Sequence, residues 1–280
     1  MQILNKEITM IALDIDGTTL NSKKELTERT RKALENAIAK GVHVVFSTGR
    51  SYNSLSEAIK SLNGVSYVIT SNGAHINEFS TGKAIYNDYV YPANVEKVIE
   101  LVEKYDIGIE VFIDGQAYID AETYHDIEKN GCEYRNAEYV LWSREPVEDI
   151  KKLMLENRNT IENVNFCFDN EEKYNKAKPE ICAIEKASIT ASFRNSLELG
   201  GENTSKRTAL IELMKMLNVE KDQLMCCGDA SNDIPMIELA GIGVAMGNAW
   251  DEVKEKADFV TESCDDDGVG IAVEKFVLNM

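Results

Sequence analysis

Two aspartates one residue apart, Asp14 and Asp16, follow the apolar run 8–13 and precede Gly17. In an extended strand, residues two apart point to the same side, so both carboxylates can face one point. Two carboxylates about 4 Å apart repel each other by roughly 4 kcal/mol at an effective dielectric constant of 20, and a hard cation such as Mg²⁺ reverses that repulsion. An ordinary Asp-Gly turn is the alternative. The pattern therefore indicates either a turn or a magnesium site.

A second group of oxygen-bearing side chains lies in the stretch GDASND, which follows the apolar run 224–227 and contains Asp229, Asn232 and Asp233. Taken alone, this stretch is typical of a turn with a helix cap. Beside the first pair of aspartates, Asp229 becomes a candidate third oxygen ligand of the cation, and Asp233 a candidate for orienting a neighbouring cation.

Other residues have the chemistry to hold a phosphate. Thr48, Gly49 and Arg50 follow the apolar run 42–46 and offer a hydroxyl group, close backbone approach and a guanidinium group. Lys206 lies near the start of a predicted helix, where backbone N–H groups and the helix dipole favour an anion. In isolation, a turn between a strand and a helix, and a solvated lysine, are the more common interpretations.

The elements that must position these residues alternate along the chain. Short apolar runs that end in polar, Gly-rich clusters predict strands at 8–13, 42–46, 67–69, 224–227 and 242–246. Amphipathic patterns predict helices at 27–41, 203–218 and 232–241, with Thr204 or Ser205 as the N-cap of the second. Alternation of this kind predicts a parallel sheet covered on both faces, which binds ligands beyond the carboxyl ends of its strands. We therefore expect the polar clusters to converge.

The middle of the chain has a different pattern. A hairpin through Asp114-Gly115, helices at 95–105 and 145–157, and strands at 163–168 and 188–193 are expected there. The fold class predicted is α/β, with a doubly wound, Rossmann-like parallel-sheet core and an inserted α+β cap domain. We expect the core at 1–83 and 196–280 and the cap at 84–195. The chain is expected to pass between core and cap at 78–83 and at 194–203.

Composition narrows the set of partners. The chain of 280 residues has 30 basic and 48 acidic residues, a net charge of −18. So acidic a chain is a poor general binder of nucleic acid or of anionic membranes. No apolar run approaches the ~20 residues that cross a bilayer. We therefore expect a cytoplasmic monomer or homodimer with a small-molecule substrate, and neither nucleic acid nor membrane as partner.

The ordered set DIDGTT, TGR, a helix-initial lysine and GDxxND resembles the haloacid dehalogenase superfamily of phosphohydrolases. The stretches SNGA, GVAMGNA and DDDGV are similar to its Cof-type branch, whose large cap is inserted between the second and third motifs. The resemblance covers the whole chain. It implies a Mg²⁺-dependent phosphomonoesterase that acts on a small phosphorylated metabolite, such as a sugar phosphate or a nucleotide or cofactor phosphate. Arg207 departs from the glycine common in the family; it is either a local variation, which we favour, or an additional contact to the anion.

The resemblance also implies a role for each matching residue. Asp14 would be the nucleophile that becomes an aspartyl-phosphate, and Asp16 would protonate the leaving oxygen and then activate water. Thr48 would bind phosphoryl oxygens, and Lys206 would neutralise negative charge. Mg²⁺ would be held by Asp14, by Asp16 through its backbone carbonyl, and by Asp229, with Asp233 in support. The implied phosphate-binding residues are Gly17, Gly49, Arg50, Asn72 and Asn232.

Two other functions remain open from the sequence. A sugar phosphomutase would use the same aspartyl-phosphate and pass the phosphoryl group to another hydroxyl. A non-catalytic sensor of phosphorylated metabolites would be expected to lack one of the two catalytic carboxylates, whereas Asp14 and Asp16 are both present.

Overall fold

The computed structural model describes residues 7–132, 136–192 and 196–280. The chain forms two compact units. The first unit comprises Met1–Gly49, Leu55–Tyr86 and Ser205–Met280, and the second comprises Arg50–Ser54 and Asn87–Thr204. The short piece Arg50–Ser54 therefore groups with the second unit, although it interrupts the sequence of the first.

The first unit is built on an eight-stranded sheet with the order β14-β13-β12-β1-β2-β3-β4-β5. Neighbours from β14 to β3 are parallel, and β4 pairs with β3 in the antiparallel direction. β1 lies in the middle and is fully buried, because its side chains are apolar on both faces. The strands are β1 (Met10–Leu13), β2 (His43–Ser47), β3 (Tyr67–Thr70), β4 (His75–Glu78), β5 (Ala84–Asn87), β12 (Leu224–Gly228), β13 (Ile242–Ala245) and β14 (Phe259–Val260).

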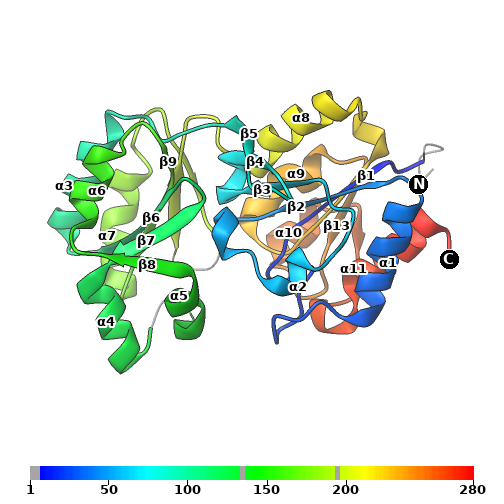
Figure 1. Cartoon of the computed structure of the whole chain (residues 1–280), viewed down its shortest axis with the longest axis horizontal. Helices are drawn as coiled ribbons and strands as arrows, with labels where there is room; N and C mark the ends of the chain where they lie inside the picture. The colour runs from blue at the N-terminus through cyan, green and yellow to red at the C-terminus, as the bar shows by residue number, and fades with distance from the viewer. Residues whose placement is uncertain (1–6, 133–135, 193–195) are drawn as a thin grey trace. The chain divides into compact units, whose positions relative to one another are not determined.

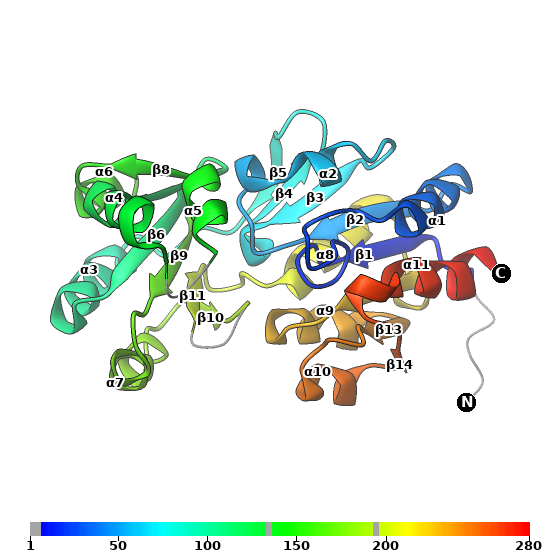
Figure 2. The same ribbon diagram turned by 90° about the horizontal axis from the view of Figure 1, so that it is seen from below.

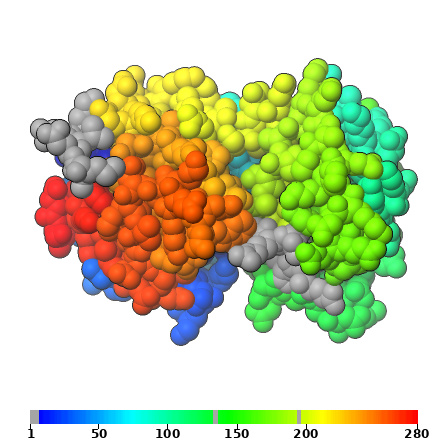
Figure 3. Space-filling view, turned by 180° about the vertical axis from the view of Figure 1, so that it is seen from behind, coloured from blue at the N-terminus to red at the C-terminus, as the bar shows by residue number. Residues whose placement is uncertain are grey.

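Helices cover both faces of this sheet. They are α1 (Glu28–Ala39), α2 (Glu57–Lys60), α8 (Lys206–Leu217), α9 (Ile234–Leu239), α10 (Asp251–Lys256) and α11 (Gly268–Val273). α1 packs on α11 at one face, and α8 packs on α9 at the other (Figure 1). The segment with α9 and α10, in orange, forms much of the surface of the first unit in the view of Figure 3. None of the helices described could cross a membrane, since none is long and apolar enough.

The second unit has a six-stranded sheet with the order β10-β11-β9-β6-β7-β8 (Figure 2). Its strands are β6 (Gly108–Ile113), β7 (Gln116–Asp120), β8 (Arg144–Val147), β9 (Ile161–Cys167), β10 (Ser188–Thr190) and β11 (Leu197–Gly200). Its helices are α3 (Asn94–Tyr105), α4 (Ala121–Asn130), α5 (Ala137–Ser143), α6 (Ile150–Glu156) and α7 (Glu171–Ile181). The apolar core of the unit joins α3, α6 and α7 to one face of the sheet. The predicted fold class, a doubly wound core with a second α+β unit, is confirmed.

Three local expectations differ from the structure. Residues 78–83 form a hairpin turn between β4 and β5, in which Glu78 N–H donates to Lys83 O at 2.9 Å, and the chain leaves the first unit only after Tyr86. Residues 197–200 pair with β9, so the return lies at Ser205; residues 194–195 of the predicted return lie outside the described residues. Residues 144–147, predicted in part as helix, form β8 because they pair with β7.

Candidate active site

Asp14 is the first residue beyond β1, at the carboxyl end of the central strand. Its backbone N–H donates to Cys227 O at 3.1 Å, which continues the β1–β12 ladder by one residue. The hydroxyl of Thr19 donates to Asp14 O at 2.6 Å and closes the loop that follows. The central position of β1 thus fixes the backbone of Asp14, and the residue is 7% exposed.

Lys206 is the first residue of α8 and faces Asp14. Ser205 caps this helix by accepting from Thr208 N–H at 3.0 Å, which fixes where the helix starts. The Lys206 ammonium donates to Asp14 Oδ1 and to Asp233 Oδ1, both at 2.6 Å, and its side chain is fully buried. Burial opposes the charge on Lys206, but the two carboxylates outweigh it and raise the pKa of Lys206.

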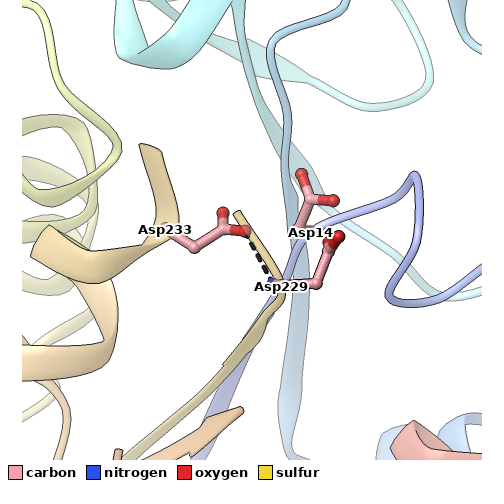
Figure 4. A group of neighbouring side chains, drawn as sticks. All are labelled: Asp14, Asp229 and Asp233. Carbon is pink, nitrogen blue, oxygen red and sulfur yellow. Dashed lines mark hydrogen bonds between the residues drawn. The ribbon is translucent and has the colours of Figure 1, made fainter. Parts of the chain in front are cut away.

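Asp14, Asp229 and Asp233 form one acidic group. Carboxylate oxygens from the three residues lie within 4.8 Å of one another. Figure 4 shows the carboxylates of Asp14 and Asp229 next to each other, with Asp233 beside the backbone of Asp229. Asp233 Oδ2 accepts the backbone N–H of Asp229 at 2.9 Å and that of Ala230 at 3.1 Å. Asp233 therefore orients both the β12 loop and Lys206.

The surroundings of the acidic group disfavour the charged forms of Asp14 and Asp229 and raise their pKa values. Burial raises the pKa of Asp14 well above its usual value, against the attraction of Lys206. Burial, and then the charge of Asp233, raise the pKa of Asp229 to about 7. Hard carboxylate oxygens gathered in this way are the ligands that a divalent cation such as Mg²⁺ prefers, and a cation would favour their charged forms. The residues present therefore fit a divalent metal ion.

The loop after Asp14 makes close contact with Asp229. Gly17 has φ +78°, and a Cβ atom there would lie 2.6 Å from Asp229 Oδ2. Thr18 donates its hydroxyl to Asp229 Oδ1 at 2.9 Å. Asn248, in the loop after β13, donates its amide to Gly17 O at 2.8 Å. The sequence reasoning did not assign Asn248; the signal was its place in the GNA stretch directly after a predicted strand.

Asp16 lies apart from the acidic group. Its carboxylate accepts from the ammonium of Lys24 at 2.9 Å, and its side chain is 39% exposed. Lys24 has φ +63°, an uncommon conformation for a lysine. The sequence reasoning missed Lys24 as a partner of Asp16, because only the fold of the 17–27 loop brings the two together.

The remaining predicted phosphate-binding residues divide into two groups. Asn72 N–H donates to Thr48 O at 3.0 Å, and Asn232 donates its amide to Asn72 Oδ1 at 3.0 Å, so the loops after β2, β3 and β12 are linked. Gly49 is the last residue of the segment Met1–Gly49 of the first unit. Arg50 groups with the second unit, where it donates to Ser54 O at 2.9 Å.

Arg207, which follows the buried lysine, is on the outside of α8. It is exposed, and its guanidinium is 3.5 Å from Pro235 O.

Comparisons with known proteins agree with this geometry. The sequence model of haloacid dehalogenase-like hydrolases matches residues 11–273. The chain is 31% identical over 274 residues to the 5-amino-6-(5-phospho-D-ribitylamino)uracil phosphatase YcsE of Bacillus subtilis, with 97% of each chain covered. Among solved structures, it resembles a haloalkanoate-superfamily phosphatase from Bacteroides thetaiotaomicron (TM-score 0.79, 28% identity, 96% of this chain and 95% of that chain covered). It also resembles a haloacid dehalogenase-like hydrolase from B. subtilis (TM-score 0.81, 26% identity, 95% and 99% covered). The chain therefore belongs to the haloacid dehalogenase-like hydrolases and is a phosphatase of their Cof-type branch.

Proposed function

We propose that the protein is a Mg²⁺-dependent phosphomonoesterase that hydrolyses a small phosphorylated metabolite through an aspartyl-phosphate at Asp14. The contact of Lys206 with both Asp14 and Asp233, beside Asp229, is the observation that carries the proposal. It combines an acidic group suited to a cation with a buried positive charge next to the proposed nucleophile.

In the first half-reaction, a carboxylate oxygen of Asp14 attacks phosphorus and the bond to the leaving oxygen breaks. Asp16 gives its proton to that oxygen. In the second half-reaction, Asp16 takes a proton from the water that attacks phosphorus, and Asp14 is released. Lys206 keeps the carboxylate of Asp14 charged and oriented, and Thr48 donates its hydroxyl to the phosphoryl oxygens.

Mg²⁺ would be held by Asp14, Asp229 and the backbone carbonyl of Asp16, with Asp233 in support. When bound, the ion neutralises phosphoryl charge, so that an anionic nucleophile can approach an anionic substrate. Gly17, Gly49, Asn72 and Asn232 are proposed to line the phosphoryl site. Arg50, given its contacts in the second unit, fits this role less well.

The proposed substrate class is a sugar phosphate or a nucleotide or cofactor phosphate. The name of the B. subtilis relative, which refers to a phosphorylated ribitylaminouracil, supports this class. We propose that the second unit acts as the cap that selects the leaving group.

The test is hydrolysis of p-nitrophenyl phosphate with and without Mg²⁺, together with rapid acid quenching of labelled substrate. We expect activity that EDTA abolishes and a hydroxylamine-sensitive label on the protein. Asp14→Asn should remove both, whereas Asp126→Asn, on the exposed face of α4, should change neither. Full activity in Asp14→Asn would refute the assignment of Asp14 as the nucleophile. Conversion of a hexose 1-phosphate to the 6-phosphate with little free phosphate would indicate a mutase instead.

A further inference from the structure

The loop 16–27 carries Asp16 and lies at the surface of the first unit. Its first turn closes on itself, since the backbone N–H of Thr19 donates to Ile15 O at 3.1 Å. Residues 22–25 are all exposed. A segment with this exposure opens locally at a low cost in free energy. Contacts that reach the loop from other segments therefore decide how firmly Asp16 is placed.

Asn248 makes such a contact at the start of the loop. Its side-chain amide donates to Gly17 O at 2.8 Å, and its Oδ1 accepts the backbone N–H of Cys264 at 2.8 Å. A carbonyl can only accept and a backbone N–H can only donate, so the group between them must offer one donor and one acceptor. An asparagine amide offers both, whereas an aspartate in its place could only accept. Asn248 is exposed, so its amide is not needed to fill the core.

The hydrogen bond to Gly17 O bears directly on the residue before it, Asp16. Gly17 adopts φ +78° and lies against Asp229, since a Cβ atom on Gly17 would be 2.6 Å from Asp229 Oδ2. A fixed carbonyl fixes the plane of the whole peptide group, and with it the turn that leads out of Asp16. Trp250, two residues after Asn248, donates its backbone N–H to Asp229 O at 3.0 Å. The loop after β13 therefore holds both the turn at Asp16 and the end of β12.

The far end of the loop is held from the same side. Asp265 Oδ1 accepts the backbone N–H of Ser22 at 2.8 Å, and Asp267 Oδ1 accepts the hydroxyl of Thr27 at 2.5 Å. Both acids follow directly after the residue whose N–H Asn248 accepts. The two ends of the loop are thus held by neighbouring stretches of the first unit, and Asn248 holds the end that carries the proposed acid–base residue.

The side chain of Asp16 is held less firmly than this turn. Its carboxylate pairs with the Lys24 ammonium at 2.9 Å, and the two side chains are 39% and 56% exposed. Ion pairs with this exposure contribute little to stability, so the carboxylate can leave Lys24 and turn toward a leaving oxygen. A side chain that turns in this way reaches the right geometry only when its backbone stays in place. That backbone position depends on the turn that Asn248 holds.

We propose that Asn248 is a positioning residue for the acid–base chemistry of Asp16. By holding Gly17 O, it fixes the turn from which Asp16 protonates the leaving oxygen and then takes a proton from the attacking water. This inference rests on the proposed phosphomonoesterase function and on the role of Asp16 in it.

Two substrates need Asp16 to different degrees in the first half-reaction. p-Nitrophenolate is a stable anion and leaves without a proton, whereas the sugar oxygen of D-ribose 5-phosphate leaves only when it is protonated. The second half-reaction, hydrolysis of the aspartyl-phosphate, is the same for both substrates and needs Asp16 as the base. Because kcat/KM reports the first half-reaction and kcat includes the second, the two constants separate these demands.

The test measures both substrates with Asn248→Ala and Asn248→Asp. For p-nitrophenyl phosphate, we expect kcat and KM to fall together by about tenfold, part of the ~10²–10⁴ that acid–base catalysis supplies, with little change in kcat/KM. A burst of p-nitrophenolate equal to the enzyme concentration should appear, because the second half-reaction becomes slow. For ribose 5-phosphate, kcat/KM itself should fall about tenfold. Tm should change by less than about 2 °C, since the side chain is exposed.

The aspartate variant separates the two contacts of Asn248. It keeps an acceptor for the N–H of Cys264 and loses the donor to Gly17 O, so Asn248→Asp should lose as much as Asn248→Ala. Asn36→Asp is the matched control, because it adds the same charge at an exposed asparagine of α1. It should behave as the unmodified protein in all of these measurements.

Asp16→Asn provides the reference pattern, with the same difference between the two substrates and a larger loss. The inference is overturned if Asp16→Asn shows this pattern and the Asn248 variants do not, or if Asn248→Asp keeps full activity, since the contact with Cys264 would then be the one that matters. An equal loss of kcat/KM for both substrates with a lower Tm would assign Asn248 a purely structural role and would also overturn it. If Asp16→Asn itself lacks the pattern, the proposed role of Asp16 is wrong, and the inference falls with it.

Discussion

Replacing Lys206 by methionine removes the only charge that faces Asp14 and Asp233 from α8 while nearly keeping the side chain's length. Each ammonium–carboxylate contact is 2.6 Å long, equivalent to about 6 kcal/mol of attraction at an effective dielectric constant of 20. Much of this attraction offsets the desolvation of the charges. Removing one partner of a buried ion pair generally costs about 3–5 kcal/mol, because the remaining charge is buried without compensation. We expect Lys206→Met to lose about 4 kcal/mol of unfolding free energy at pH 8 without metal.

The loss should depend on pH in a defined direction. Without Lys206, the pKa of Asp14, already raised by burial, rises further. An acid whose folded pKa lies above its unfolded value contributes stability at low pH and loses it as the pH rises through the folded pKa. The difference between the variant and the unmodified protein should therefore be smaller at pH 5 than at pH 8. Mg²⁺ should restore part of the loss, since it would supply the missing positive charge.

Urea unfolding followed by circular dichroism, in EDTA and in millimolar Mg²⁺, measures these differences. Lys215→Met is the matched control on the same helix, because Lys215 is exposed and pairs with Glu212 at the surface; it should leave unfolding almost unchanged. A loss in Lys206→Met no larger than that of the control, or a loss that is the same at pH 5 and pH 8, would refute the reasoning.

Two further predictions concern Asp229 and the loop that contacts it. Gly17→Ala should reduce activity at least tenfold, because its Cβ would displace the Asp229 carboxylate; Gly41→Ala, also at positive φ but with nothing within 4 Å, should lose about 1–2 kcal/mol of stability and keep its activity. Equal activities of the Gly17→Ala and Gly41→Ala variants would contradict this prediction. Because the pKa of Asp229 is raised from 3.8 to about 7, metal-free stability should fall as the pH rises between these values, and Mg²⁺ affinity measured by calorimetry should increase up to about pH 7. A Mg²⁺ affinity that does not change with pH would contradict the second prediction.

Local patterns were sufficient for much of the fold. The buried strand before Asp14 and the cap of α8 follow from apolar runs and from the residues that end them, since both depend on neighbours in sequence. Residues 150–156 form the helix α6 as predicted, whereas residues 78–83 and 145–147 were predicted wrongly for one reason. Whether such a stretch turns, crosses or pairs depends on a partner strand, β5 in one case and β7 in the other, that the local sequence does not identify.

In the active site, too, some features follow from the local sequence and others only from the tertiary structure. The sequence by itself determined which residue types are available, Asp14, Asp229, Asp233 and Lys206 at strand ends and a helix start, because motif spacing and strand periodicity are local properties. Only the tertiary structure decided that one ammonium is shared by two carboxylates and that Asp16 pairs with Lys24. These contacts form between residues that are far apart in the sequence, and their energies depend on how deeply the residues are buried. A local stretch of sequence specifies neither the partner nor the burial, so the contacts could not be predicted from it.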